Sequence, residues 1–459
     1  MGQLSERVVL INPPATHVRE KHYEYAENPR IGLAYLAAYL RGKGVDCDVI
    51  DAKYERLTVE DVLDRLRPGV ADIIGMTAMT PEICDCAEMA ARIRGEHSPV
   101  MVIGGPHATA LPEETLAEFK EFDIACVGEG EETLYDIVSS VRGGGALGAI
   151  PGIVYRDGDG VTNTGRREFM RDLDSLPGPA WDLFPASKIY PILASRGCPA
   201  RCNFCMRVLG GKVRFRTPEH VVREMEETYE RYDPSFFKFY DETFGVNKEY
   251  TGRLLDGIIA SGLNRKIKWS VTTRVDVLDE RLFRRMKDAG CEWVSFGIES
   301  GNENVLKSSA KNITKEKAKK AVAAAKKAGL KTWAYFILGH PDEDRDTLKE
   351  TIDFASELDT LMVSFGLMVP YPGTRIWEMA LAGEGGYRLL SRDWKLYNKQ
   401  TDVVLELKDI DQMTLKKYQL RGYLKFFLLR PSIAKTLSLF REVDILSVIR
   451  ILFLRLAGR

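Results

Sequence analysis

Three cysteines stand within eleven residues in the stretch SRGCPARCNFC (residues 195–205). The spacing is C-x3-C-x2-C, with thiols at Cys198, Cys202 and Cys205 and no fourth ligand close by in the sequence. A structural zinc site normally takes four ligands, whereas three thiolates can hold a cubane iron–sulfur cluster and leave one iron open. The stretch therefore predicts an iron–sulfur site that can bind a substrate or cofactor. A zinc site completed by a distant histidine such as His220 is the alternative.

The chain around this stretch is long and ordinary in composition. Its 459 residues exceed what one core usually accommodates, so two or three domains are expected. The net charge of −1 gives no general attraction to nucleic acid. No signal peptide and no run of about 18 uncharged apolar residues is apparent, so we expect a cytoplasmic protein whose eight cysteines stay reduced.

The first third alternates short apolar runs with helical patterns. The expected strands are 8–12, 47–52, 72–77, 100–105 and 123–130, and the expected helices are 31–44, 58–67, 81–94, 111–120 and 131–141. Nearly continuous apolar strands are buried on both faces, which is typical of a parallel, doubly wound sheet of the Rossmann or flavodoxin type. We expect this domain to span residues 1–145.

Polar residues and glycines follow these strands, at the edge where doubly wound sheets bind ligands. The residues are Asn12, Pro13, Thr77, Thr80, Gly104, Gly105, His107, Gly128, Glu129 and Gly130. Glycines allow a flat ligand or a phosphate to approach the backbone closely. Turn chemistry alone could explain any single loop, but the set together predicts a ligand-binding edge.

A second array of strands and helices carries the cysteines. Residues 146–186 predict a β-hairpin followed by a proline-rich linker, and 187–380 predict six strand–helix repeats. The expected strands are 190–195, 236–244, 267–276, 292–301, 331–341 and 361–374. Six repeats fit a partial TIM-type (β/α)6 barrel, whose active site lies at the carboxyl ends of its strands.

The cysteine stretch in this setting resembles the cluster motif of radical S-adenosylmethionine (SAM) enzymes, over about residues 187–375. The resemblance implies a [4Fe-4S] cluster with SAM on its open iron, and a 5′-deoxyadenosyl radical that abstracts hydrogen from a substrate. It also implies carboxylates for the ammonium of SAM, later strand ends for its carboxylate, ribose and adenine, and an aromatic residue beside the cluster. The residues that match these positions are Asp241, Glu242, Arg274, Glu299, Ser300, Gly339 and Phe204.

The first domain resembles the cobalamin-binding branch of that family. The matching stretches are NPP (12–14), PRIGLAYLAAYL (29–40), GGPHAT (104–109) and GEGEETL (128–134). The cobalt-ligating D-x-H-x-x-G motif of many corrinoid proteins is missing, and neither His17 and His22 nor His107 stands in its context. We therefore expect cobalamin without a protein histidine ligand, or with water below the cobalt.

This pairing of domains implies methylation of an unactivated carbon through methylcobalamin. Such a carbon is not nucleophilic, so a radical has to abstract its hydrogen atom before the methyl group can be added. The implied partners are a small-molecule or lipid-like substrate and a reductant such as flavodoxin or ferredoxin. Two alternatives remain open: an oxidative cyclase resembling the anaerobic magnesium-protoporphyrin ester cyclase, and a non-catalytic corrinoid sensor or carrier.

The last segment, 381–459, predicts a helical extension. From residue 413 it combines basic residues with apolar residues at helical spacing. This pattern fits a helical cap on the barrel or a peripheral membrane contact. Cys84 and Cys86 lie one residue apart on an expected helix and point in different directions, so we expect a single cluster.

Overall fold

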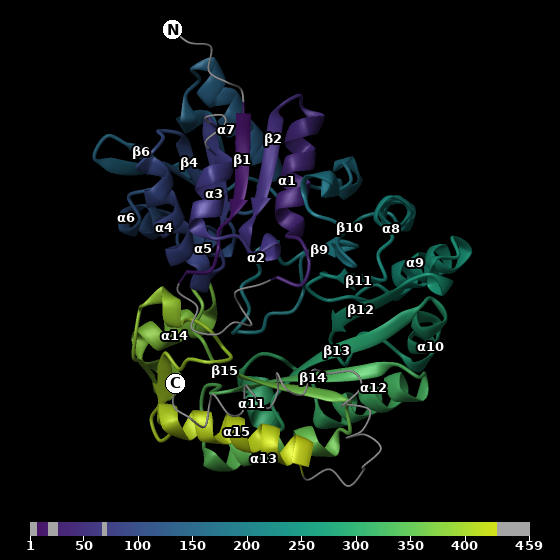
Figure 1. Cartoon of the computed structure of the whole chain (residues 1–459). Coiled ribbons are helices and arrows are strands. Elements are labelled where there is room, and N and C mark those ends of the chain that lie inside the picture. Colours follow the sequence, from purple (N-terminus) through teal and green to yellow (C-terminus); the bar gives the residue numbers. More distant parts are fainter. Residues whose placement is uncertain (1–6, 17–25, 67–70, 429–459) are drawn as a thin grey trace.

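The computed structural model describes residues 7–16, 26–66 and 71–428. Two parallel sheets dominate the molecule, and helices cover both (Figure 1). The amino-terminal sheet and the cysteine-bearing sheet face each other at the edges where their strands end, and the carboxyl-terminal segment closes one side. The α/β fold expected from the sequence is confirmed.

The first sheet contains the five expected parallel strands. They are β1 (Arg7–Asn12), β2 (Asp46–Asp51), β3 (Ile73–Thr77), β4 (Val100–Gly104) and β5 (Ile124–Cys126), in the order β2-β1-β3-β4-β5. The covering helices are α1 (Ile31–Gly42), α2 (Ala52–Glu55), α3 (Val59–Leu66), α4 (Ile83–Arg94), α5 (Pro106–Ala110), α6 (Pro112–Glu118) and α7 (Glu131–Gly143). Strand β5 is shorter than expected because the chain turns at Gly128, where φ is +87°.

The predicted hairpin belongs to this sheet and not to a linker. Strands β6 (Ile153–Asp157) and β7 (Gly160–Asn163) extend it as an antiparallel edge beside β5. The guanidinium of Arg156 donates to the carbonyls of Leu116, Phe119 and Phe122, and so fastens the hairpin to α6 and the β5 entry. The first structural unit therefore extends past residue 145.

The second sheet has the six expected parallel strands. They are β8 (Ile189–Ile192), β11 (Phe236–Phe239), β12 (Lys268–Thr273), β13 (Cys291–Glu299), β14 (Lys331–Leu338) and β15 (Met362–Leu367), in sequential order from β8 to β15. Its helices are α8 (Pro218–Tyr232), α9 (Lys248–Ala260), α10 (Glu280–Asp288), α11 (Glu303–Ser308), α12 (Lys315–Lys327), α13 (Arg345–Glu357) and α14 (Arg375–Ala382). This is the partial barrel that the repeats predict.

Side-chain caps explain why the barrel helices begin where they do. A Thr, Asn or Asp immediately before each helix accepts a hydrogen bond from a backbone amide of the first turn, which satisfies an otherwise unpaired donor. These residues are Thr217, Asn247, Asp279, Asn302, Thr314, Asp344 and Thr374.

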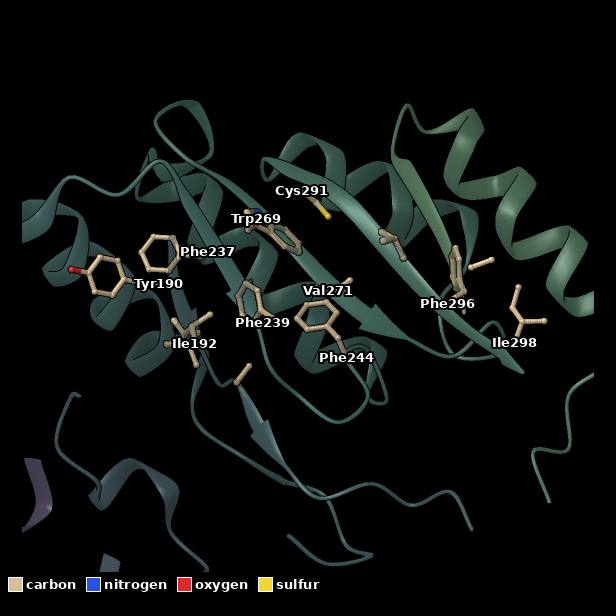
Figure 2. Packing of buried hydrophobic residues seen from close by; sticks show 14 of the residues in the cluster. Tyr190, Ile192, Phe237, Phe239, Phe244, Trp269, Val271, Cys291, Phe296 and Ile298 are labelled. Carbon is tan, nitrogen blue, oxygen red and sulfur yellow. The ribbon is translucent and has the colours of Figure 1, made fainter. Parts of the chain in front are cut away.

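Aromatic residues fill the core beneath the first barrel strands (Figure 2). Phe239 packs edge-on against Phe244 and Trp269, with ring centroids 5.2 and 5.3 Å away. The indole of Trp269 donates to the carbonyl of Ala289, so its one polar atom is satisfied inside the core. This rigid base supports the loops that follow β8 and β11.

The carboxyl-terminal segment is only partly helical, whereas the sequence predicted a helical extension. It contains an antiparallel pair, β16 (Tyr387–Leu389) with β17 (Leu405–Leu407), before helix α15 (Gln412–Leu428). The indole of Trp394 reaches the first domain and donates to Glu118 at 2.9 Å. Residues 429–459 of the predicted membrane-contact segment lie outside the described residues, and no described helix is long and apolar enough to span a bilayer.

Candidate functional site

The cysteine loop is held between two short antiparallel strands, β9 (Ser195–Arg196) and β10 (Arg214–Phe215). The loop can close only because residue 197 is glycine. Its φ is +99°, and a Cβ there would collide with the carbonyl oxygen of Lys212. The amide of Cys198 then donates to the carbonyl of Gly210, which aims the loop at the barrel mouth.

The three cysteines line one cavity of about 410 Å³, here called the cysteine cavity. A hydrogen bond from Cys205, aided by the nearby Lys311 and Arg274, lowers the pKa of the Cys202 thiol to about 6 despite its burial. The Cys198 sulfur lies 3.3 Å from the hydroxyl of Thr243. Thiolates are the ligands that iron–sulfur clusters use, so these residues fit the predicted cluster.

The geometry disfavours a zinc site. Among the described residues, no three Cys, His, Asp or Glu side chains converge on a point that could hold one metal ion. His220 is engaged elsewhere, because its Nδ1 lies 3.1 Å from Asp174 Oδ1 at the N-terminus of α8.

Four of the seven residues predicted for the SAM side also line the cysteine cavity: Phe204, Glu242, Arg274 and Glu299. Arg274 is oriented by Asp276 and by the carbonyl of Lys311, both at 2.9 Å. Burial raises the pKa of the Glu242 carboxyl, against a hydrogen bond from the Gly197 amide.

The other three residues support the strand ends from outside the cavity. Asp241 accepts hydrogen bonds from the Ala194 amide and the Ser195 hydroxyl, and burial raises its pKa to about 6. The hydroxyl of Ser300 forms a hydrogen bond with the hydroxyl of Thr351, and the amide of Gly339 donates a hydrogen bond to the carboxylate of Glu343. The structure therefore does not bring Asp241, Ser300 and Gly339 to the cavity surface.

Sequence reasoning missed several residues of this cavity. Lys311 donates to Glu299 at 2.8 Å, with both side chains 8% exposed. Lys311 follows a short helix, at a turn where Ala310 and Asn312 have left-handed backbone conformations. The search for site residues at the ends of predicted strands therefore could not find it. Lys399 lies in the segment that follows the barrel, and the sequence analysis did not predict it as a site residue either.

The strand ends of the first sheet border a second, larger cavity of about 690 Å³. Seven of the predicted residues line it: Asn12, Thr77, Gly104, Gly105, Gly128, Glu129 and Gly130. A Cβ at Gly105, where φ is +92°, would lie 2.8 Å from the Ala78 carbonyl and from the Thr77 hydroxyl. At Gly128 the backbone instead borders open space, which fits the close approach of a flat macrocycle.

The remaining three predicted residues lie away from the larger cavity. His107 is buried, with Nδ1 3.4 Å from Thr80 Oγ1 and its ring 5.0 Å from that of Trp394. Burial lowers its pKa to about 4, so it is a neutral core histidine. Pro13 is buried beside β1. Within the described residues no histidine lines the cavity, while His17 and His22 lie outside them.

A partly buried ion network that the sequence did not suggest forms one wall of the larger cavity. Glu82 accepts from Arg30 at 3.0 Å and from Lys53 at 2.8 Å. These two cations hold the pKa of Glu82 well below its usual range even though burial opposes ionisation. The network leaves that wall polar and rigid.

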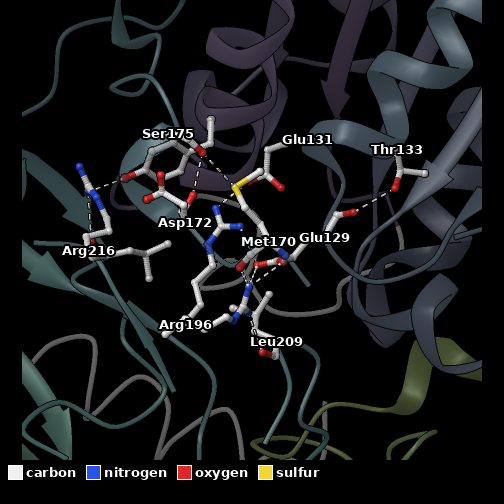
Figure 3. A network of polar contacts seen from close by, with 12 residues as sticks. Glu129, Glu131, Thr133, Met170, Asp172, Ser175, Arg196, Leu209 and Arg216 are labelled. Carbon is white, nitrogen blue, oxygen red and sulfur yellow. Dashed lines mark hydrogen bonds and ion pairs between the residues drawn. The ribbon is translucent and has the colours of Figure 1, made fainter. Parts of the chain in front are cut away.

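The two cavities adjoin at one side chain, because Glu242 lines both. Arg196, two residues before the first cysteine, also lines the larger cavity and donates to Glu129 and Glu131 of the first domain (Figure 3). The edges of the two domains therefore meet between the two cavities.

Comparison with known proteins agrees with this architecture. Residues 192–355 match the family model of the radical SAM superfamily, and residues 25–138 match that of the B12 binding domain. The uncharacterized methyltransferase PH0819 of Pyrococcus horikoshii is 34% identical over 437 residues, covering 93% of each chain. The anaerobic magnesium-protoporphyrin IX monomethyl ester cyclase of Rubrivivax gelatinosus is 30% identical, covering 92% of this chain and 77% of the relative.

A solved structure shares the whole arrangement of domains. TsrM from Kitasatospora setae, a radical SAM methyltransferase with cobalamin and a [4Fe-4S] cluster bound, aligns with a TM-score of 0.72 at 18% identity, over 86% of this chain and 79% of that one. The chain belongs to the radical SAM enzymes that carry a B12-binding domain. Its cofactors are accordingly a [4Fe-4S] cluster, SAM and cobalamin.

Proposed function

We propose that this enzyme methylates an unactivated carbon atom of its substrate. When bound, the three cofactors supply an electron to cleave SAM, a radical that abstracts hydrogen, and a methyl group for the carbon radical. The observation that carries the proposal is that Glu242 lines both cavities, so a substrate there would touch the radical source and the corrinoid edge together. The methyltransferase relative, aligned over 93% of both chains, supports the same reaction.

We assign roles to the chain's residues accordingly. Cys198, Cys202 and Cys205 hold the cluster, and Glu242 binds the ammonium of SAM through a charge-assisted hydrogen bond. Arg274 and the Lys311–Glu299 pair border the same space and set its charge.

Gly128, after β5, leaves room for the corrin ring beside the backbone, since a Cβ there would meet no atom closer than 4.0 Å. The Arg30–Glu82–Lys53 network provides fixed polar groups at its rim. Aromatic and aliphatic side chains on the barrel side, among them Tyr335 and Phe336, keep water from the radical.

The test is anaerobic reconstitution with iron, sulfide and hydroxocobalamin, followed by reduction in the presence of SAM. We expect 5′-deoxyadenosine and tightly bound corrinoid in the same preparation. The nucleoside without bound corrinoid would contradict methyl transfer through cobalt. The cyclase relative supports an oxidative reaction as the second candidate, which predicts 5′-deoxyadenosine without loss of the methyl group from SAM.

Three finer proposals concern partners. The electron donor is a flavodoxin or ferredoxin. This proposal is tested by measuring whether the reconstituted enzyme oxidises the reduced carrier protein. The substrate is a small or lipid-like molecule.

The basic, apolar tail makes a peripheral membrane contact, since α15 leaves Met413 and Leu424 exposed while it packs on β15 through Gln419. Deleting residues 413–459 should abolish weak binding to anionic vesicles, and binding that is absent in the full chain would refute the contact.

A further inference from the structure

Three of the six charged side chains that line the cysteine cavity form ion pairs within the protein. Arg274 forms an ion pair with Asp276 at 2.9 Å, and Lys311 forms one with Glu299 at 2.8 Å. These cations are therefore neutralised by the protein itself and bring no net charge to a ligand.

Two cations on the cavity wall are not paired. Within the part of the chain that the structure describes, the side chains of Arg207 and Lys399 form no ion pair and no hydrogen bond, yet both line the cavity. Arg207 belongs to the cysteine loop, whereas Lys399 lies in the segment between β16 and β17. The two cations therefore reach the cavity from different segments of the chain.

The position of Lys399 is fixed by backbone contacts. Its carbonyl accepts from the amide of Leu367, the last residue of β15, at 2.7 Å. Its side-chain stem crosses Gly366, where a Cβ would lie 3.7 Å from the Lys399 Cδ. The hydroxyl of Tyr371 donates to the carbonyl of Tyr397 at 3.0 Å, which ties the same segment to the barrel mouth. The backbone of Lys399 is thus held in place, and its exposed side chain lines the cavity from this segment.

SAM does not account for Lys399. Its ammonium and carboxylate are attached to one carbon atom, and both lie at the cluster when Glu242 binds the ammonium. Glu242 follows β11, which is four strand positions from β15 in the sheet, or about 19 Å along it. Arg207, in the cysteine loop, is the unpaired cation on the cluster's side, so Lys399 is left for another anion.

We propose that Lys399 binds an anionic group of the substrate, a carboxylate or phosphate, while the substrate's apolar body packs against Ile337, Met368 and Val369 of the same cavity. This inference rests on the proposed function, because it places the group in that active site. An exposed ammonium on a flexible stem is suited to a single charge-assisted contact with such a group.

The test uses four probe molecules with the reconstituted holoenzyme and SAM: decanoate, decanol, decylamine and acetate. Binding is measured by anaerobic equilibrium dialysis at 0.15 M salt. We expect decanoate to bind about tenfold more tightly than decanol or decylamine, as one charge-assisted contact predicts. Acetate should bind much more weakly than decanoate, because it lacks the apolar body. Acetate that binds as tightly as decanoate would overturn the part of the inference that packs an apolar body against Ile337, Met368 and Val369.

Variants assign the preference to this residue. Lys399→Met should remove the advantage of decanoate over decanol, and Lys399→Arg should retain it. Lys408→Met is the matched control and should change nothing, because Lys408 is an exposed lysine that follows β17 and does not line the cavity. Equal binding of decanoate and decanol, or a preference that survives in Lys399→Met, would overturn the inference.

The two levels of the proposal fail differently. Formation of 5′-deoxyadenosine and corrinoid binding are measured on the same preparations. If both are present and the decanoate preference is missing, only the role of Lys399 is wrong. If neither is present, the proposed function itself is wrong, whatever decanoate does.

Discussion

Arg196 and Glu129 form a buried ion pair between the two domains, with 2.9 Å from Nη1 to Oε1 and both side chains 7% exposed. Arg196 precedes the cluster cysteines, and Glu129 follows the last parallel strand of the first sheet. Arg214 adds a second guanidinium to the same carboxylate at 2.8 Å, and the amide of Met170 donates to it as well. A buried charge without a partner is costly, so Arg196 and Glu129 have to stay paired. This contact therefore fixes the position of one domain edge relative to the other.

Replacing Glu129 should therefore cost far more than replacing a neighbouring carboxylate. Glu129→Gln leaves two buried guanidinium groups short of a counter-charge, so we expect the free energy of unfolding to fall by about 3 kcal/mol. Glu132→Gln, in the first turn of α7 three residues further on, changes a side chain that is 44% exposed in its contact with Arg167 and should cost less than about 1 kcal/mol. Urea denaturation of both variants makes the comparison, and equal losses would contradict the assigned role.

The three cysteines should hold all the iron. Each of Cys198→Ala, Cys202→Ala and Cys205→Ala should lose the cluster absorbance and the formation of 5′-deoxyadenosine. Cys84→Ala and Cys86→Ala should retain about four irons per chain, because these thiols belong to α4. A wild-type iron content near eight per chain would show that a second cluster exists.

Two glycines at the larger cavity should separate folding from corrinoid binding. Gly105→Ala places a Cβ 2.8 Å from the Ala78 carbonyl at a positive φ, so we expect a loss of stability of about 2 kcal/mol. Gly128→Ala, also at a positive φ, meets no atom closer than 4.0 Å and should cost about 1 kcal/mol, while its methyl group weakens hydroxocobalamin binding. Thermal unfolding and corrinoid dialysis distinguish the two, and unchanged dialysis of Gly128→Ala would refute its place at the ring.

A buried carboxyl makes stability depend on pH. Burial raises the pKa of Glu343 to about 8 from an ordinary 4.5, although two backbone amides donate to it. The folded state holds this proton more tightly than the unfolded state, so stability is greatest at low pH and falls as pH rises toward 8.

Glu343→Gln should remove that decline. Between pH 6 and pH 8.5 the wild type should lose on the order of 3 kcal/mol relative to the variant. Glu357→Gln, which removes an exposed ion pair at the end of α13, is the control and should follow the wild type. Parallel stability curves for wild type and Glu343→Gln would contradict the assignment.

The sequence predicted the strands well because burial on both faces leaves a continuous apolar signal. All five parallel strands of the first sheet and all six of the second lie where apolar runs predicted them. The hairpin was recognised, but its sheet was not, because the bonds from Arg156 to three carbonyls join residues 34 to 40 positions apart. The β16–β17 pair was missed because its strands are only three residues long.

The site was predictable where chemistry depends on local spacing. The cysteine motif and the glycine turns are short-range features, and the structure brings them to the two cavities. Residues such as Lys311 and Lys399 enter through tertiary contacts that no local pattern records. Conversely, Asp241 and His107 stand at strand ends as expected, but their side chains turn into the protein and serve its packing.

The central claim is that the corrinoid and the cluster serve one active site that is joined at Glu242. Electron paramagnetic resonance of the reconstituted enzyme, with Co(II) and the reduced cluster present together, tests it most directly. The account predicts a magnetic interaction that speeds the relaxation of each centre relative to samples that contain one centre alone. Spectra that equal the simple sum of the two separate centres would contradict it.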